Sequence, residues 1–394
     1  MPNSPLQFDV IVLGAGAAGL MCAARAGSRG RRVALLDHNG QAGRKILISG
    51  GGRCNFTNLH CSAKNFISQN PHFAKSALAL YEPPQFIELV DRYGIRWHEK
   101  TLGQLFCDGS AREILEMLLA ECELGGVEIF LNAHEIEVAG SAQGGFRIAS
   151  SRGEFSADAL VVATGGLSIP KLGATGLAYD LARQFGLGIV EPRPALVPLA
   201  LGGAEANWTA LAGVATEVVA SAGVANFREK MLVTHRGLSG PAVLQASSYW
   251  RPGEPLTLDF SPTAQTKIFS ALKEPGARRD LMAVKQALRE VLPQRLANHL
   301  AEASNASGWS NAALEARELE LHRWVFHPVG TEGFEKAEVT AGGVDTDGLQ
   351  ARTMEARHVP GLFFVGESVD VTGQLGGFNF QWAWASGMAA GNAL

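Results

Sequence analysis

The sequence is poor in cysteine, with five in 394 residues and no CxxC pair among them. The five are Cys22, Cys54, Cys61, Cys107 and Cys122. An odd number without paired spacing argues against both a disulfide framework and a zinc site. We therefore expect a reducing, cytoplasmic location. Because HExxH and comparable ligand spacings are also missing, we predict no metal site.

Charged residues and long apolar runs are also scarce. Charged residues make up 18% of the chain and the net charge is -4, so a large basic surface is not expected. The apolar run Val10–Ala24 resembles the core of a signal peptide, but no Lys or Arg precedes it and glycines interrupt it. It is also too short to span a bilayer. We therefore expect neither export nor membrane insertion.

Glycine, in contrast, is abundant, with 46 residues, or about 12% against roughly 7% in average proteins. Gly14, Gly16 and Gly19 form GxGxxG between a predicted strand, Phe8–Leu13, and a predicted Ala-rich helix, Leu20–Ser28. In such a motif the first glycine permits a tight turn and the second lets a pyrophosphate approach the backbone. The third lets the helix pack on the strand. The motif predicts dinucleotide binding.

Three predicted strand ends extend this interpretation. Asp37 ends the second strand, where an acidic side chain binds ribose hydroxyls. Val161–Gly166 is a buried strand that runs into a glycine turn, and Gly361–Asp370 is another that ends in glycine and acids. The GxGxxG motif alone does not separate NAD from FAD. Together, the three strand ends indicate a long, extended cofactor.

Two glycine-rich segments are suited to the rest of such a cofactor. Gly43–Asn58 combines Arg44, Lys45, Ser49, three glycines and Arg53, a set of donors and flexible backbone suited to phosphate and flavin edges. Gly373–Gly377 opens the last helix. The amino end of a helix carries free N–H groups and partial positive charge, which would stabilise a reduced flavin.

The predicted fold class is α/β, with a split Rossmann-like FAD-binding domain, an inserted β-barrel-like domain and a small helical subdomain. After Pro194 short alternating segments predict antiparallel strands, and apolar spacing over Arg279–Ala303 predicts helices interrupted at Pro293. We expect the FAD-binding domain at 1–190 and 341–394, the β-barrel-like domain at 191–262 and 312–340, and the helical subdomain at 263–311.

These segments together resemble the bacterial flavoproteins of the YhiN-like or BaiN-like family, which are related to aminoacetone oxidase-like FAD enzymes. The resemblance spans most of the chain. Its marks are GAGAAG at Gly14–Gly19, GRKILISGGGRCNFTN at Gly43–Asn58, THRGLSGP at Thr234–Pro241 and the long run Ala341–Gly387. One departure is Asp37, where related flavoproteins commonly carry Glu.

The motifs and the resemblance imply noncovalent FAD, with NAD(P)H as a possible electron donor. The predicted cofactor-binding residues are Gly14, Gly16, Ala17, Ala18, Gly19, Asp37, Arg44, Lys45, Ser49, Gly50, Gly51, Arg53, Ala163, Thr164, Gly165, Gly366, Glu367, Asp370, Gly376, Gly377, Phe378 and Asn379. Family members have been associated with amine oxidation, reduction of an unsaturated steroid, and reduction of uridine in ribosomal RNA.

Three residues are candidates for catalysis. The charge of Arg53 could stabilise reduced flavin and raise the thiolate fraction of Cys54, although a buried cysteine is more often an inert apolar residue. His235 is a possible proton donor, although a lone histidine more often packs or caps. A hydrolase is not predicted, because Pro241 occupies the last glycine position of GxSxG.

The sequence leaves three functions open. The first is a reductase in which NAD(P)H reduces the flavin and a hydride passes from N5 to an unsaturated small molecule or nucleobase. The others are a flavin amine oxidase and a noncatalytic flavin-binding protein. RNA is a possible partner that the net charge does not indicate. A local basic patch, which would more often be a solvated helix face, consists of Arg278, Arg279, Lys285, Arg289 and Arg295.

Overall fold

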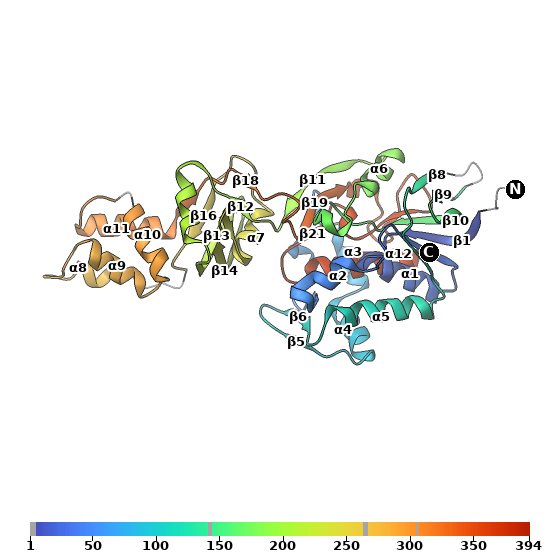
Figure 1. The fold of residues 1–394 in the computed structure, drawn as a ribbon, viewed down its shortest axis with the longest axis horizontal. Coiled ribbons are helices and arrows are strands. Elements are labelled where there is room, and N and C mark those ends of the chain that lie inside the picture. Colours follow the sequence, from blue (N-terminus) through green and yellow to red (C-terminus); the bar gives the residue numbers. More distant parts are fainter. Residues whose placement is uncertain (1–4, 141–143, 263–266, 305) are drawn as a thin grey trace. The chain divides into compact units, whose positions relative to one another are not determined.

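A computed structural model describes residues 5–140, 144–262, 267–304 and 306–394 (Figure 1). The chain forms two compact units. The first unit comprises Met1–Arg193 and Val339–Leu394, and the second is Pro194–Glu338. The expected split α/β domain is therefore confirmed, with contributions from both ends of the chain. Within the described residues, no helix is both long and apolar enough to cross a membrane.

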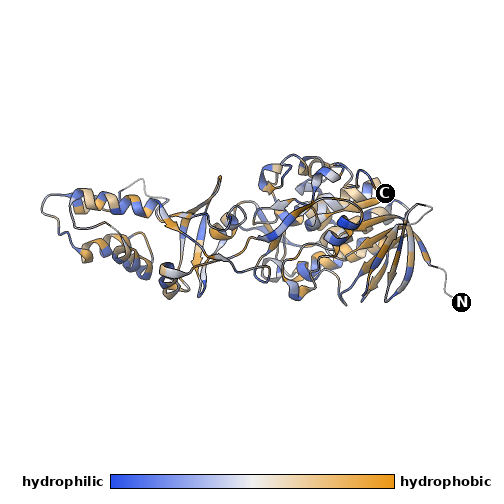
Figure 2. Cartoon of the chain, turned by 90° about the horizontal axis from the view of Figure 1, so that it is seen from above, coloured by the Kyte–Doolittle hydropathy of each residue, from blue (hydrophilic) through white to orange (hydrophobic). Residues whose placement is uncertain are grey.

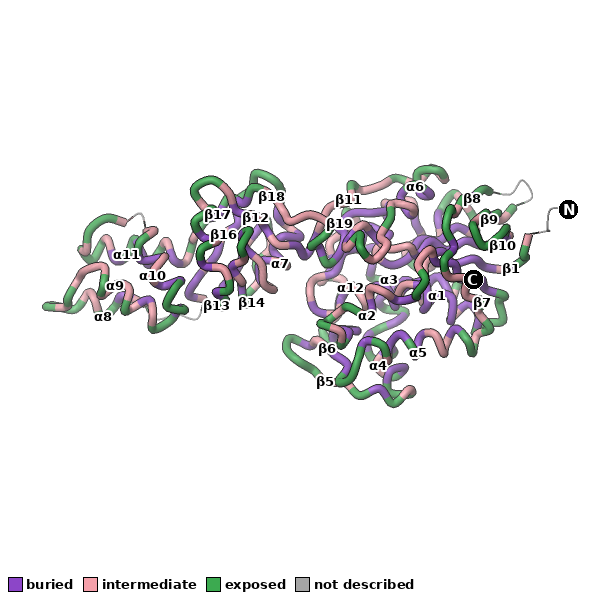
Figure 3. Tube along the Cα trace, in the orientation of Figure 1, coloured by how far each residue is buried: buried purple, intermediate pink, exposed green. Residues whose placement is uncertain are grey.

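The first unit is built on a seven-stranded sheet in the order β7-β2-β1-β10-β9-β8, with β20 paired to β10. Its strands are β1 (Leu6–Leu13), β2 (Val33–Asp37), β7 (Glu128–Leu131), β8 (Glu137–Gly140), β9 (Phe146–Ser150), β10 (Gly153–Val162) and β20 (Leu362–Phe364). The sheet is mixed: β7, β2, β1, β10 and β20 pair in parallel, whereas β9 and β8 add antiparallel strands. Its central strands are largely apolar and buried (Figures 2 and 3).

The register of the parallel strands brings their carboxyl ends together. Leu13 of β1 pairs with Leu36 of β2 and with Val162 of β10, and Val162 in turn pairs with Phe364 of β20. The segments that follow these four strands therefore leave the same edge of the sheet. In open α/β sheets this edge is where ligands bind.

Helices α1 and α12 pack closely on each other because small residues line their contact. A Cβ atom added to Gly387 of α12 would lie 2.5 Å from the carbonyl oxygen of Ala18 of α1. The helices of the first unit are α1 (Ala17–Ser28), α2 (Arg44–Ile48), α3 (Ala74–Leu80), α4 (Pro83–Arg92), α5 (Ala111–Leu124), α6 (Leu177–Gln184) and α12 (Phe378–Ala393).

Three small sheets complete the first unit and its boundary. They are β3 (Asn55–Asn58) with β6 (Gln104–Cys107) and β5 (Trp97–Glu99), then β4 (Phe66–Ile67) with β21 (Thr372–Gly373), and β11 (Ile189–Ala195) with β19 (Val339–Val344). The β4–β21 pair joins the segment before α12 to the segment that follows the glycine-rich loop, Gly43–Asn58.

The second unit contains an antiparallel sheet in the order β17-β16-β13-β14-β15-β12-β18. Its strands are β12 (Leu199–Ala200), β13 (Ala215–Ala222), β14 (Ala225–Val233), β15 (Gly237–Ser239), β16 (Leu256–Asp259), β17 (Trp324–Phe326) and β18 (Gly330–Thr331). Its helices are α7 (Pro241–Ser247), α8 (Ser270–Lys273), α9 (Leu281–Arg289), α10 (Gln294–Ala303) and α11 (Asn311–His322).

The helical segment extends further than the sequence predicted. We expected β structure to resume at residue 312, but α11 continues to His322, so this boundary is wrong. The hydroxyl of Ser310 caps the new helix by accepting from the N–H of Ala313, and Leu314 and Leu321 are buried in the core of the second unit. Residues 306–309, which precede this cap, are not helical, so the sequence shows no continuous helical pattern from α10 into α11.

Candidate cofactor site

The glycine turn after β1 has the geometry that its motif predicts. Gly14 has φ +107°, and a Cβ atom on it would lie 2.5 Å from the carbonyl oxygen of Ala163. A Cβ atom on Gly19 would lie 1.9 Å from the carbonyl oxygen of Gly14. Gly16 differs, because nothing lies within 4 Å of the position its Cβ would take. This open side of Gly16 fits the approach of a pyrophosphate.

Asp37, at the end of β2, is 9% exposed and fixes this turn. One oxygen accepts from the N–H of Ala15 at 2.7 Å, and the other accepts from the N–H of Asn39 at 2.7 Å. The side chain of Asn39 is itself held by the Arg44 guanidinium at 2.6 Å. The acidic residue and the predicted basic residue thus form one cluster beside the turn. The ribose contact of Asp37 stays a prediction.

Two buried polar atoms without a hydrogen-bond partner lie at the ligand edge, which is the edge of the sheet formed by the carboxyl ends of β1, β2, β10 and β20. The hydroxyl oxygen of Thr164, directly after β10, is buried and has no hydrogen-bond partner in the described structure. The same holds for Nε2 of His38, directly after β2. Beside Thr164, a Cβ atom on Gly165 would meet open space. Buried polar groups are normally satisfied, so these atoms fit a site shaped for a polar ligand such as FAD.

The end of β20 reaches the same turn. Gly366 has φ +67°, and a Cβ atom on it would lie 2.8 Å from the Cβ of Ala18, the second residue of α1. Asp370 is buried and accepts from the N–H of Gln69 at 2.8 Å. Its burial raises the pKa of this carboxyl. The structure therefore brings together the glycine turn, Ala163–Gly165 and Gly366.

A charged network links the glycine-rich loop to this edge. Nζ of Lys45 donates to Oε2 of Glu367 at 2.7 Å and to Oγ of Ser168 at 2.6 Å. The Ser168 hydroxyl donates to the other Glu367 oxygen at 2.9 Å, which also accepts from the N–H of Thr340 at 2.8 Å. The side chain of Tyr179 is buried, its hydroxyl has no partner in the described structure, and burial and nearby Glu367 raise its pKa.

Sequence reasoning found Lys45 and Glu367 in this network but missed its members Ser168 and Thr340, and it missed the nearby Tyr179. Ser168 lies only three residues beyond Gly165, so its closeness to a predicted turn was the available signal. Thr340 and Tyr179 come from distant segments without a motif of their own. Their position depends on how β19 and α6 pack, which sequence spacing does not reveal.

The loop after α2 contains two of the catalytic candidates, Arg53 and Cys54, which differ in their exposure. Ser49 donates to the carbonyl of Ile46 at 2.7 Å, and Gly50 and Gly51 adopt positive φ values. Arg53 is exposed, whereas Cys54 is 0% exposed. The backbone N–H of Cys54 donates to the carbonyl of Ser49 at 3.1 Å, and burial raises the pKa of the Cys54 thiol.

The expected activation of Cys54 by Arg53 is therefore wrong. Burial raises the pKa of the Cys54 thiol and so lowers its thiolate fraction, and Arg53 is exposed whereas Cys54 is fully buried. The burial of Cys54 fits the alternative of an inert apolar residue, and a catalytic role for this thiol stays a prediction. The predicted contact of Arg53 with the cofactor is unaffected.

The turn before α12 is held by tight packing. Gly376 and Gly377 have φ +120° and +93°, and a Cβ atom on Gly377 would lie 2.3 Å from the carbonyl oxygen of Thr57. The Asn379 side chain accepts from the N–H of Gly373 at 2.8 Å and donates to its carbonyl at 2.9 Å. The Phe378 ring is buried, and the first N–H groups of α12 have no partner within the helix. The cofactor contacts of Phe378 and Asn379 stay predictions.

His235 belongs to the second unit, on an exposed turn between β14 and β15. The following Gly240 has φ +85°, and a Cβ atom on it would lie 2.7 Å from the backbone nitrogen of Leu232. This glycine is thus required by backbone packing, in line with a structural turn rather than a hydrolase elbow. The proton-donor role of His235 stays a prediction.

The basic side chains of the suggested patch form ion pairs and hydrogen bonds within the protein. Arg278 pairs with Asp280 and Lys285 with Glu302, while the remaining three arginines donate to protein oxygens. These contacts favour the interpretation as an ordinary helix surface over an RNA site. In the described residues, no group of three or more His, Cys, Asp or Glu side chains is placed to hold a metal ion.

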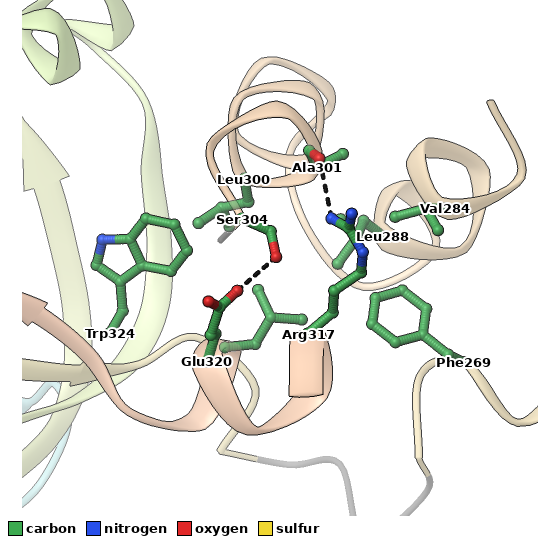
Figure 4. A pocket seen from close by; sticks show the side chains of 10 residues that line it. Phe269, Val284, Leu288, Leu300, Ala301, Ser304, Arg317, Glu320 and Trp324 are labelled. Atoms are coloured by element: carbon green, nitrogen blue, oxygen red, sulfur yellow. Dashed lines mark hydrogen bonds between the residues drawn. The ribbon is translucent and has the colours of Figure 1, made fainter. Parts of the chain in front are cut away.

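A pocket in the helical part of the second unit is lined mainly by apolar side chains (Figure 4). Arg317 projects into it, but its guanidinium donates to the carbonyls of Ala301, at 3.4 Å, and Ala306. Ser304 donates to Glu320 across the same space. These contacts join α10 and the residues after it to α11, so we assign the polar groups a structural role.

Residues 8–393 match the HI0933-like protein Rossmann domain family. The ribosomal RNA dihydrouridine synthase of Escherichia coli strain K12 is 48% identical over 395 residues, covering 98% of each chain. The protein of the same name from Haemophilus influenzae is 43% identical and covers 96% of each chain. The 3-dehydro-bile acid delta(4,6)-reductase of Clostridium scindens is 31% identical, covering 97% of this chain and 98% of its own.

Solved flavoenzymes share the fold. A quinol-fumarate reductase with menaquinol molecules has a TM-score of 0.51 at 16% identity, covering 99% of this chain and 71% of its own. The 3-ketosteroid-delta4-(5alpha)-dehydrogenase from Rhodococcus jostii RHA1 has a TM-score of 0.50 at 14% identity, covering 99% and 98%. At these identities the likeness concerns the Rossmann-type FAD-binding fold alone.

Proposed function

Since this chain belongs to the HI0933-like family, we propose that it reduces uridine in ribosomal RNA to dihydrouridine. The chain is an FAD-dependent oxidoreductase. The proposal concerns its substrate and its electron donor. The observation that carries the proposal is the 48% identity to the Escherichia coli relative, which extends over 98% of both chains. We propose NAD(P)H as the donor.

The chemistry in the relatives' names favours reduction over the amine oxidation that the sequence left open. Dihydrouridine is uridine with two hydrogens added across a carbon–carbon double bond, and the third relative is named as a reductase. Bound FAD supplies two-electron hydride chemistry for such an addition.

In this proposal, different residues of the first unit bind different parts of FAD. The open backbone at Gly16 receives the pyrophosphate, while Asp37 and Thr164 offer polar groups on either side of it. The free N–H groups at the start of α12 contribute partial positive charge. Arg53, exposed on the glycine-rich loop, supplies a further positive charge.

Anaerobic mixing tests the proposal in two stages. NADPH or NADH should bleach the flavin absorbance, whereas a small primary amine should not. Adding ribosomal RNA that lacks dihydrouridine should then restore the oxidised spectrum, and an unsaturated 3-ketosteroid should leave it bleached. Reduction of the flavin by the amine, or reoxidation of the flavin by the steroid and not by the RNA, would contradict the proposed activity.

A further inference from the structure

We propose that the Lys45 ammonium sets the reduction potential of the bound FAD, with Glu367 and Ser168 as positioning residues. Lys45 lies in α2, Ser168 follows β10, and Glu367 follows β20. Three separate segments therefore converge on one ammonium group. The inference rests on FAD binding and does not depend on which substrate the enzyme reduces.

The contacts restrain the Lys45 ammonium closely. It is 2.7 Å from a Glu367 oxygen and 2.6 Å from the Ser168 hydroxyl. The Lys45 side chain is 36% exposed and that of Glu367 is 20% exposed. A lysine of this flexibility normally samples many rotamers at a surface, whereas two short hydrogen bonds fix its charge at one place.

Strand order places this charge on one side of the glycine turn. Along the ligand edge the strands follow the order β2, β1, β10, β20. A dinucleotide with its ribose at Asp37 of β2 and its pyrophosphate at the turn after β1 continues toward β10 and β20. Glu367 and Ser168 follow these two strands, so we place the Lys45 ammonium beside the flavin half.

The sign of the effect follows from charge. Two-electron reduction adds negative charge to the isoalloxazine ring, and a fixed cation in a partly buried site stabilises that charge more than it would in water. The Glu367 carboxylate opposes the same charge while holding Lys45. Lys45 should therefore raise the potential, and Glu367 should lower it.

The test is the midpoint potential of the FAD-loaded protein, measured by anaerobic spectroelectrochemical titration. In Lys45→Met we expect the affinity for reduced relative to oxidised FAD to fall about tenfold, or about 30 mV for a two-electron couple. In Glu367→Gln we expect a shift of the opposite sign, and in Ser168→Ala a smaller fall. Lys273→Met breaks the Lys273–Glu315 pair of the second unit as a matched control, and should not change the potential.

Two outcomes would overturn the proposal. One is a Lys45→Met protein that binds FAD more weakly but keeps the parental potential, which would make Lys45 a phosphate contact. The other is a Glu367→Gln protein whose potential is unchanged or lower. The second result remains decisive if Lys45→Met does not retain FAD. Neither measurement involves RNA, so failure here is distinct from failure of the proposed activity.

Discussion

The carboxylate of Asp37 accepts a hydrogen bond from the N–H of Ala15 at 2.7 Å and so ties the end of β2 to the glycine turn. Asp37→Ala would leave buried donors unpaired, at about 1–3 kcal/mol each. We expect a lower melting temperature and weaker FAD binding, measured by quenching of flavin fluorescence.

Asp9→Ala is the matched control for Asp37. The Asp9 carboxylate accepts from the N–H of Arg32 at 2.7 Å, beside the start of β2 and away from the carboxyl ends of β1 and β2. This change should leave FAD affinity unaltered. Equal losses of FAD affinity in the two variants would show that Asp37 acts only through general stability.

Gly16 and Gly19 should respond differently to a side chain. Gly16→Val should keep the fold and weaken FAD binding, because the new side chain occupies open space where we place the pyrophosphate. Gly19→Ala should destabilise the protein even without FAD, because its Cβ would lie 1.9 Å from the carbonyl oxygen of Gly14. Melting temperatures of the apoproteins and FAD titrations separate the two effects. Parental FAD affinity in Gly16→Val would place the cofactor elsewhere.

Cys54→Ser should leave both redox half-reactions intact. The thiol is fully buried, so a hydroxyl in its place should lower stability by about 1–3 kcal/mol without touching the chemistry. Stopped-flow measurement of flavin reduction and reoxidation, with urea unfolding, checks both parts. A variant that loses substrate turnover while its flavin still reduces normally would show that Cys54 has a catalytic role.

Cys61 should react slowly with thiol reagents at neutral pH. Burial raises its pKa to about 12, and only the thiolate is nucleophilic, so a raised pKa lowers the reactive fraction. The alkylation rate of the folded protein should rise about tenfold per pH unit through pH 9 without levelling off. Cys61→Ser identifies the reacting residue. A plateau near pH 9 would indicate an ordinary, accessible thiol.

Much of the first unit could be predicted from sequence because its signals are local. The GxGxxG turn, the strand before it and Asp37 are determined by neighbours within a few residues, and the structure reproduces them. Helix α11 was misassigned for the same reason. Its cap at Ser310 follows the non-helical residues 306–309, so local periodicity gave no continuous signal.

The network around Lys45 could not be predicted in the same way. Lys45 and Glu367 are 322 positions apart, and their contact depends on β20 returning beside β10. The failure of the expected activation of Cys54 by Arg53 has a related cause. Adjacent residues in an irregular loop can point to different environments, and sequence order does not show which side chain is buried.

The formation of dihydrouridine in ribosomal RNA tests the central proposal most directly. Ribosomal RNA lacking this modification would be incubated with the FAD-loaded protein and NAD(P)H, then digested to nucleosides for mass spectrometry. The account predicts a uridine that gains two hydrogens with the parental protein, and little or none with Gly16→Val. RNA that remains unmodified by a protein whose flavin is reduced by NAD(P)H would contradict the proposed substrate.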